Sequence, residues 1–172
     1  GTLNFTDLNA GDTGSFSLPA GLGDNALFNI APDGTTLQAK LPFDYELKNS
    51  YSLIVRVTDA GGLSVDETFQ INVTNANESP TNITLQGTTV DENLPSGTDI
   101  GTFSTIDPDF ESTFSYEIVP VSGSSDHESF TIFGGTLKTT AAFDFESKSN
   151  YSIRIRSTDL GGLAYEKDFL IS

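Results

Sequence analysis

Carboxylate side chains recur at short, fixed spacings in this sequence, and they are its best candidates for chemistry. Asp44 and Glu46 lie two positions apart, and Asp107 and Asp109 share that spacing around Pro108. In an extended segment, residues i and i+2 point to the same side, so each pair can present both carboxylates together. Paired carboxylates of this kind suit either a hard cation or an acid–base reaction.

The acidic pattern occurs twice, one hundred residues apart. Residues 43–71 and 143–171 share fourteen identities in twenty-nine aligned pairs without a gap. Repetition at about the length of a domain is typical of a tandem array, and a unit of that size can bury its own core. We therefore expect two domains, residues 1–76 and 77–172, of which the first lacks the counterpart of residues 82–100.

The elements that must position these carboxylates have the pattern of β-strands. Apolar and polar residues alternate over residues 51–57, and residues 69–73 form a second such run after a Gly-Gly turn that begins at Asp59. The later copy repeats both runs and the turn, there beginning at Asp159. Period-two alternation with frequent turn signals, and without a sustained helical period, predicts an all-β protein built from β-sandwiches.

Composition narrows the class of partner. Twenty-four acidic residues stand against eight basic ones, for a net charge of −16. Nucleic acids and anionic lipids both require a basic face, so we expect neither nucleic-acid binding nor direct membrane insertion. No window approaches the length of apolar sequence that a membrane helix needs. The acidic balance is compatible with divalent cations.

Signals for catalysis are weak. The chain has one histidine, His127, in a polar segment without a candidate nucleophile beside it, and it has no cysteine. Two carboxylates could hydrolyse a glycosidic bond, but the chain has no tryptophan to form a sugar platform. No phosphate-binding loop or metalloprotease motif is present. We expect a protein that is not an enzyme.

Five segments resemble the cadherin repeat signature, in its order. They are Phe-Asp-Tyr-Glu at 43–46, the alternating run and Asp-x-Gly at 51–61, the linker at 75–80, Val-Asp-Glu-Asn with Gly-Thr at 90–98, and Asp-Pro-Asp at 107–109. The residues that make up these motifs are most similar to those of cadherin-like tandem domains of large bacterial exoproteins. This resemblance implies two tandem Greek-key, immunoglobulin-like β-sandwiches of the cadherin type, the first truncated at its N-terminal strand.

The resemblance also implies Ca²⁺ as the cofactor, held between consecutive repeats. The implied ligands are Asp44, Glu46, Asn75, Asn77, Glu78, Asp107, Asp109 and Asp159. The implied ligands of a following junction are Glu92, Asp144 and Glu146, and those of a preceding junction are Asp7, Asn9 and Asp59.

Three departures from the family pattern affect the expected number of ions. Asn75 replaces an aspartate of the linker, the first copy has no counterpart of Glu92, and Tyr45 stands where the family has a basic residue. Fewer charged ligands bind fewer cations, so we expect one or two ions, bound weakly, instead of a cluster of three.

The function that the resemblance implies is a calcium-binding structural and adhesive module of a secreted or cell-surface protein, stiffened by Ca²⁺ at the interdomain junction. Its expected partners are neighbouring repeats of the same chain and a cell-surface protein or polysaccharide. The alternative is a carbohydrate-binding accessory module of a secreted bacterial protein. Phe110, Phe133 and Tyr165 on one outer face would favour that alternative.

Overall fold

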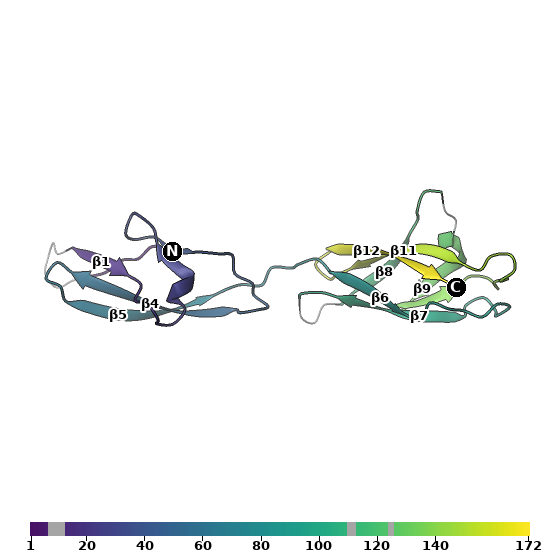
Figure 1. The fold of residues 1–172 in the computed structure, drawn as a ribbon, viewed down its shortest axis with the longest axis horizontal. Coiled ribbons are helices and arrows are strands. Elements are labelled where there is room, and N and C mark those ends of the chain that lie inside the picture. Colours follow the sequence, from purple (N-terminus) through teal and green to yellow (C-terminus); the bar gives the residue numbers. More distant parts are fainter. Residues whose placement is uncertain (7–12, 110–112, 124–125) are drawn as a thin grey trace. The chain divides into compact units, whose positions relative to one another are not determined.

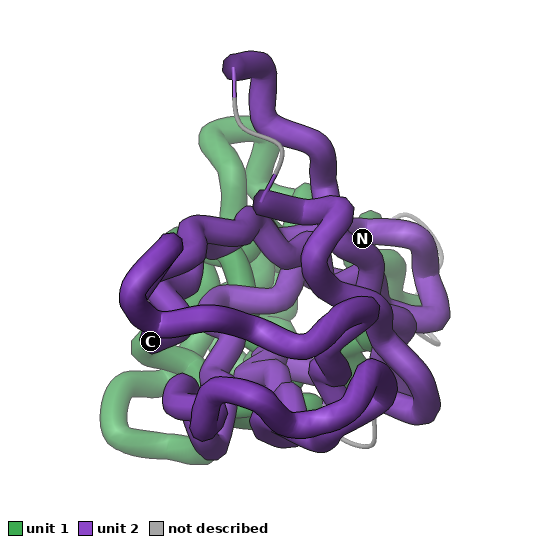
Figure 2. The backbone as a smooth tube through the Cα atoms, turned by 90° about the vertical axis from the view of Figure 1, so that its right-hand side faces the viewer, with its two compact units in different colours: residues 1–76 green, residues 77–172 purple. Residues whose placement is uncertain are grey.

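The chain divides into two compact units, residues Gly1–Ala76 and Asn77–Ser172 (Figure 2). Within the described residues, both consist of β-strands and connecting turns, apart from one short 3-10 turn in each unit (Figure 1). The all-β fold expected from the sequence is thus confirmed. The computed structural model describes residues 1–6, 13–109, 113–123 and 126–172.

Unit 1 is built on a three-stranded sheet in the order β1-β4-β5 and a two-stranded sheet, β2-β3. All of these strand pairs are antiparallel. The elements are β1 (Gly14–Ser17), η1 (Asn25–Leu27), β2 (Phe28–Ile30), β3 (Leu37–Ala39), β4 (Ser50–Asp59) and β5 (Ser64–Asn72).

Unit 2 has a four-stranded sheet in the order β6-β7-β10-β9 and a three-stranded sheet in the order β12-β11-β8. The crossings between the two sheets give the antiparallel sandwich its Greek-key character. The elements are β6 (Asn82–Gln86), β7 (Asp99–Ile106), β8 (Ser115–Val119), η2 (Asp126–Ser129), β9 (Phe130–Phe133), β10 (Thr136–Thr139), β11 (Tyr151–Thr158) and β12 (Ala164–Ile171).

The alternating run of the sequence forms the central strand of each unit. In β4, Tyr51, Leu53 and Val55 are buried, because every second side chain of a strand faces the core. The second predicted run lies in β5, but that strand begins at Ser64 and ends at Asn72, one residue earlier than expected. Val73 lies beyond it and donates its backbone N–H to the Asn49 carbonyl at 2.9 Å.

Each unit has its own apolar core. Phe28, Tyr51, Leu53 and Val55 form the buried set in unit 1. The core of unit 2 is larger and comprises Ile83, Ile100, Phe103, Phe130, Leu137, Phe143, Ile153, Ile155 and Ile171. Two separate cores are what tandem domains require, since each must offset its own conformational entropy.

The two units differ most at their first strands. In unit 2, β6 pairs with β7 from Asn82↔Ile106 to Gln86↔Thr102. Among the described residues of unit 1, no strand corresponds to β6, and the segment equivalent to β7 forms no regular strand but pairs through the isolated bridge Thr2↔Thr36 and the backbone hydrogen bonds beside it. The truncation of the first sandwich, expected from the sequence, is confirmed.

Across the described residues, no helix is both long enough and apolar enough to span a membrane.

Candidate metal sites

Two strands of opposite sheets bring acidic residues to one end of unit 2. The hydroxyl groups of Thr105 on β7 and Ser157 on β11 lie 2.6 Å apart, and Ser157 is fully buried. Asp107 and Asp159 each follow two positions later, on the same side of their strands. The strand ends therefore direct both carboxylates toward the same end of the sandwich.

Asp159 is the most buried carboxylate described in the chain, at 6% exposure. Its Oδ2 accepts a hydrogen bond from Asn77 Nδ2 at 2.9 Å, and its Oδ1 accepts one from the Leu163 N–H at 2.9 Å. Burial opposes ionisation, but the hydrogen bonds from Asn77 and from the turn amides outweigh it and lower the pKa of Asp159. The side chain is thus held as an anion.

Glycine at position 161 allows the linker to approach the turn. A Cβ atom added there would lie 2.4 Å from the Asn77 side chain. Any other residue would push Asn77 away from Asp159. The glycine of the Asp-x-Gly motif therefore has a steric reason for its identity.

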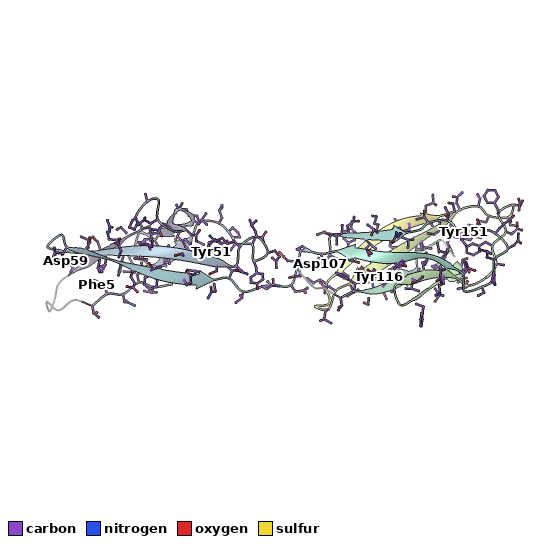
Figure 3. All side chains as sticks on the ribbon, turned by 90° about the horizontal axis from the view of Figure 1, so that it is seen from below. Phe5, Tyr51, Asp59, Asp107, Tyr116 and Tyr151 are labelled. Carbon is purple, nitrogen blue, oxygen red and sulfur yellow. The ribbon has the colours of Figure 1, made fainter. Side chains whose placement is uncertain are left out.

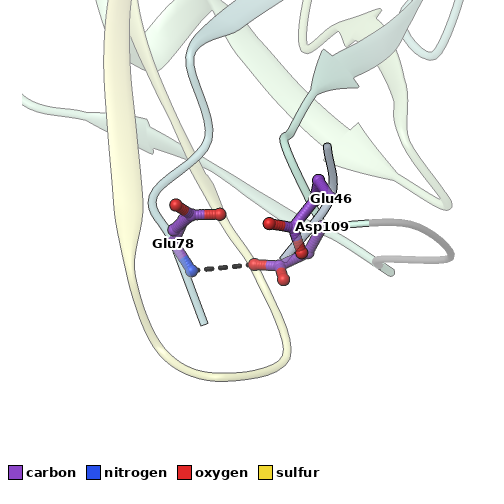
Figure 4. Close-up of side chains that lie close together, drawn as sticks. All are labelled: Glu46, Glu78 and Asp109. Carbon is purple, nitrogen blue, oxygen red and sulfur yellow. Dashed lines mark hydrogen bonds between the residues drawn. The ribbon is translucent and has the colours of Figure 1, made fainter. Parts of the chain in front are cut away.

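Asp107, Asp109 and Glu78 form a second hydrogen-bonded group in unit 2. The Glu78 N–H donates to Asp109 Oδ2 at 2.8 Å (Figure 4), and the Asp109 N–H donates to Asp107 Oδ1 at 2.8 Å. Asp107 lies at one end of the unit, away from Tyr151 (Figure 3). The loop after β7 and the linker segment before β6 are joined through carboxylate oxygens.

One oxygen of this group has no partner. Asp107 Oδ2 is buried and accepts no hydrogen bond from any described residue. A buried carboxylate oxygen without a partner is costly, unless a cation or water completes it. Hard cations such as Ca²⁺ take about six to eight oxygen ligands from carboxylates, amides and carbonyls. The donor set of Asn77, Glu78, Asp107, Asp109 and Asp159 has that chemistry, and it fits the cation that the sequence resemblance implies.

Glu92, Asp144 and Glu146 form a separate acidic group in unit 2. One carboxylate oxygen from each lies within 4.8 Å of the others, and all three residues are exposed. Glu92 Oε2 also accepts the N–H of Phe145 at 3.1 Å, which ties the loop after residue 90 to the loop after β10. The structure thus brings together the three residues expected to serve a following junction.

The Asp144 carboxylate is oriented by its own turn. The Ser147 hydroxyl donates to Asp144 Oδ2 at 2.6 Å, and the Glu146 N–H donates to Oδ1 at 3.2 Å. The Ser147 hydroxyl contributes most to lowering the pKa of Asp144. Three carboxylates this close repel one another, so a cation bound among them would relieve an unfavourable interaction.

The other expected ligands belong to unit 1. Asp44, Glu46 and Asn75 are exposed, and Asp44 Oδ1 accepts the Leu47 N–H at 2.8 Å. Asp59 Oδ1 accepts the Leu63 N–H at 2.8 Å, as Asp159 does from Leu163. Asp7 and Asn9, expected at a preceding junction, lie outside the described residues.

Of the three aromatic residues named for a sugar-binding face, the two that the structure describes do not share an outer face. Phe133 is 77% exposed at the end of β9, whereas Tyr165 on β12 packs against the core of unit 2. Phe110 lies outside the described residues. His127, the one histidine, lies half-buried in η2.

Sequence reasoning missed the residues that support the ligands. The Thr105–Ser157 pair gives no sequence signal, because both are common surface residues. The approach of Asn77 to Gly161 joins positions far apart in the chain. Ser147, three residues after Asp144, is an ordinary Asx-turn pattern and could have been found.

Part of the chain matches a known protein family. Residues 86–168 match the cadherin domain family model. Mouse Protocadherin Fat 4 is 33% identical over 94% of this chain, and human Protocadherin-1 is 30% identical over 85% of it. The chain spans 3% and 14% of the lengths of these two relatives. Both relatives are mammalian proteins, whereas the sequence motifs had favoured bacterial exoproteins.

Solved structures agree on the fold. Human Protocadherin-24 EC1-2 superposes with a TM-score of 0.69 at 21% identity, covering 95% of this chain and 77% of that one. Chicken VE-cadherin EC1-2 gives a TM-score of 0.56 at 22% identity, covering 99% and 88%. The two units are tandem β-sandwiches of the cadherin type. The expected location, outside the cell or at its surface, is confirmed by these relatives.

Proposed function

We propose that the chain is a calcium-binding tandem module of an extracellular or cell-surface protein, in which Ca²⁺ at the junctions between repeats stiffens the array. Its role is structural and adhesive, and it performs no catalysis. Its first partners are neighbouring repeats of the same chain, and a cell-surface protein is a further partner. The cadherin resemblance motivates the proposal, and the chemistry of unit 2 supports it.

The observation that carries the proposal is the buried, unpartnered Oδ2 of Asp107. The nearby backbone N–H groups of Asp109 and Glu78 already donate to other oxygens, Asp107 Oδ1 and Asp109 Oδ2 respectively. A folded protein keeps such an oxygen without a donor when something outside the chain completes it. A cation fits better than a water molecule, since the residues around the end of unit 2 are also acidic.

The proposed ligands at the junction are those of both copies. Unit 2 would contribute Asn77, Glu78, Asp107, Asp109 and Asp159, and unit 1 would contribute Asp44, Glu46 and Asn75. Bound Ca²⁺ would supply positive charge that converts mutual repulsion of these carboxylates into attraction. The chain's own residues position the ligands. Asn77 and the turn amides hold Asp159 as an anion, and the backbone N–H of Asp109 orients the Asp107 carboxylate.

Glu92, Asp144 and Glu146 are proposed as ligands for the junction that would follow unit 2. Their exposure means that they can meet residues of a further repeat. We expect weaker binding there, in this chain alone, than at Asp107, whose Oδ2 is buried. With the loss of charge at Asn75, one or two ions in total are proposed.

A carbohydrate-binding role gains no support from the described aromatic residues, because Tyr165 contributes to the core. The likeness to repeats of bacterial exoproteins stays a prediction from the motifs.

The test is calcium titration by calorimetry, together with thermal unfolding in chelator and in millimolar Ca²⁺. We expect saturable binding and a higher melting temperature with calcium, because a ligand at ten times its Kd stabilises the folded state by about 1.4 kcal/mol. Asp107→Asn should abolish the shift in unit 2, since it removes the charge and keeps the shape.

The matched control is Asp99→Asn, which removes an exposed carboxylate of the same unit that pairs with Lys138. This variant should keep the full calcium response. If native protein binds no calcium, or if Asp99→Asn and Asp107→Asn weaken binding equally, the acidic residues only solvate the surface.

A further inference from the structure

A groove lies along one side of unit 1, between β1 of one sheet and η1 and β2 of the other. Its volume is about 400 Å³, and its apolar lining residues are Phe16, Leu18, Ala20, Ala26, Phe28 and Ile30. Phe28 is buried at its floor, whereas Ala20 and Ala26 are exposed. Every lining residue lies between positions 16 and 40, in the interior of the chain. An apolar hollow of this size is a candidate contact surface.

Hydrogen bonds fix the wall of the groove that connects β1 to η1. The buried Asn25 side chain donates to the Pro19 carbonyl at 2.9 Å and to the Ile54 carbonyl at 2.8 Å, and it accepts the Ile54 N–H at 2.9 Å. The Asp24 N–H also donates to the Ser52 carbonyl at 2.7 Å. Because this segment is held against β4, the groove exists before a partner arrives, which lowers the entropic cost of binding.

Lys40 gives the groove its charge. It is the one charged side chain among the described lining residues, and its Nζ donates to the Ala26 carbonyl at 2.8 Å. An ammonium group has three donors, so two are left for an occupant. Lys48 and Arg56, the other basic residues of unit 1, each pair with an aspartate, whereas no described carboxylate pairs with Lys40. In a chain of net charge −16, the groove is thus a local cationic site.

The equivalent place in unit 2 has the opposite charge. Lys40 donates through Nζ to the Ala26 carbonyl, and in unit 2 the Thr140 hydroxyl donates to the Glu128 carbonyl at 2.9 Å. Threonine and an exposed glutamate therefore stand where unit 1 has lysine and alanine. The two units share their backbone contacts here, yet only unit 1 would attract a carboxylate.

Exposed leucines lie beside the lining residues of the groove in the chain. Leu22, Leu27 and Leu41 are each exposed, and each directly follows a residue that lines the groove. At the positions of Leu27 and Leu41, unit 2 has Ser129 and Ala141. At these positions, unit 1 therefore exposes the larger apolar side chains, as a contact surface for another protein requires.

We propose that this groove of unit 1 docks an acidic peptide segment of a cell-surface partner protein, which inserts one apolar side chain over Phe28 and pairs a carboxylate with Lys40. In an extended segment, residues two positions apart point to the same side, so both groups can face the groove. The apolar side chain provides buried area, and the ion pair provides selectivity. This inference rests on the adhesive part of the proposed function and names the chemistry of its partner.

The experiment uses the whole 172-residue chain and three blocked synthetic peptides. The first is Ser-Gly-Phe-Gly-Glu-Ser, the second has glutamine in place of its glutamate, and the third has alanine in place of its phenylalanine. Amide chemical shifts follow binding, in millimolar Ca²⁺ and again in chelator. We expect saturable shifts in residues 16–21, 25–30 and 40. The glutamine peptide should bind about threefold more weakly and the alanine peptide about tenfold more weakly than the first.

Substitution of Lys40 tests the ion pair. Lys40→Gln should remove the difference in affinity between the glutamate and glutamine peptides, because the charge that distinguishes them is gone. Its matched control is Lys138→Gln, the same change at a cation of unit 2, which should leave that difference in place. Both side chains lie at the surface, and the melting temperature of each variant checks that it folds.

Substitution of Ala26 tests the apolar wall. Ala26→Glu introduces the residue that unit 2 has at the equivalent position, where the backbone contacts are the same. The glutamate peptide should bind this variant at least about tenfold more weakly, since its own carboxylate is repelled and the wall is polar. Thr68→Glu is the control: it adds the same charge to an exposed site on β5 outside the groove and should leave binding unchanged.

Three outcomes would overturn the proposal. Equal binding of the glutamate and glutamine peptides by the native chain would rule out recognition by Lys40. Shifts confined to unit 2, or no saturable shifts, would rule out the groove. Shifts of the groove residues that grow with protein concentration in the absence of peptide would make a second copy the occupant. A chain that binds Ca²⁺ but no peptide loses this proposal and keeps the calcium proposal, and the converse result separates the two in the other direction.

Discussion

At the strand ends that carry the acidic residues, three equivalent positions have polar side chains in unit 2 and apolar side chains in unit 1. Unit 2 has Thr105, Tyr116 and Ser157, joined by hydrogen bonds of 2.6 and 3.0 Å to the Thr105 hydroxyl. Unit 1 has Phe5, Phe16 and Val57 there, with the two rings 5.9 Å apart and edge to face. A polar network in one copy thus corresponds to an apolar cluster in the other.

The opposite ends of the units, by contrast, are nearly identical. Phe43 stacks on Tyr51 with centroids 4.3 Å apart, and Phe143 stacks on Tyr151 at 4.4 Å. Lys48 lies 4.7 Å from the ring centre of Tyr51, and Lys148 lies 4.8 Å from that of Tyr151. Each lysine also pairs with an aspartate, Asp24 in unit 1 and Asp126 in unit 2.

This comparison indicates which end of a repeat tolerates substitution of its side chains. The aromatic end is closed by side chains of the same unit, so both copies need the same packing. The strand ends near Asp107 and Asp159 are held by hydroxyl groups that fix two strands of opposite sheets. Unit 1 fills the equivalent place with apolar side chains, among them Phe5 and Phe16.

The largest expected effect comes from removing the anchor of β6. Ile83→Ala deletes a fully buried side chain from unit 2, where unit 1 has no counterpart. Large-to-small changes in a core cost about 2–5 kcal/mol, so unit 2 should unfold at a much lower urea concentration. Residue-resolved NMR during urea titration separates the two units. An equal loss in unit 1 would show that the two cores unfold as one.

Two equivalent glycines, Gly61 and Gly161, allow the stability of the two acidic turns to be compared. Gly161→Ala would press a Cβ atom against the Asn77 side chain at 2.4 Å, whereas at Gly61 the nearest atom is Asp59 Oδ1 at 3.3 Å. We expect Gly161→Ala to destabilise unit 2 by about 1.5–3 kcal/mol, because it breaks the hydrogen bond to charged Asp159. Gly61→Ala should cost unit 1 less.

Calorimetric unfolding of both glycine variants checks this difference. A Gly161→Ala variant as stable as the native chain, with the Asn77 side-chain amide resonance unmoved, would contradict the role of the close approach.

A smaller effect should follow from the hydroxyl network. Ser157→Ala removes one hydrogen bond from a buried site, while Thr105 keeps its bond to Tyr116. The expected loss of unfolding free energy is about 1 kcal/mol. Ser115→Ala is the control, since that exposed hydroxyl makes only a 3.5 Å contact with the Thr158 carbonyl. Urea denaturation should rank the two variants in that order.

The smallest difference is expected in acid, because both units share the same ion pair. A hydrogen bond from Lys48 lowers the pKa of Asp24, and one from Lys148 lowers that of Asp126. A folded pKa below the unfolded value of about 3.9 contributes stability above that pH, and the contribution is lost as pH falls through the folded value. Both units should therefore weaken together below about pH 4.

Asp24→Asn and Asp126→Asn should each flatten this pH dependence in their own unit only, as measured by thermal unfolding between pH 2 and 7. A loss of acid sensitivity in both units from one substitution would contradict independent pairs.

Much of the fold could be predicted from alternation and repetition. The run around Leu53 and its copy around Ile153 indicated central strands because a strand that faces a core repeats every two residues. The turns at Asp59 and Asp159 followed from glycine pairs. The ends of strands were less accurate, as at Val73, since hydrogen bonding to Asn49 lies beyond any local pattern.

The candidate site was predictable only in its ligands. Carboxylates at fixed spacing carry a signal, and Glu92, Asp144 and Glu146 do converge. The supporting contacts were not predictable, because Thr105 meets Ser157 and Asn77 meets Gly161 only after the sheets pack. Asn25 is a further case: it is buried, its Nδ2 donates to the Ile54 carbonyl and its Oδ1 accepts the Ile54 N–H, a tertiary contact without a sequence motif.

The stacked tyrosines have a spectroscopic consequence. The chain contains no tryptophan, so its near-ultraviolet absorption and emission arise from five tyrosines and the phenylalanines. Tyr51 and Tyr151 each lie between a phenylalanine ring and a lysine ammonium, in almost the same geometry. Each unit thus carries a matched chromophore in a rigid, asymmetric setting, and Tyr51→Phe or Tyr151→Phe would silence one of them. The difference between the native and variant near-ultraviolet circular dichroism could then follow the surroundings of each of these two tyrosines during melting, without any added dye.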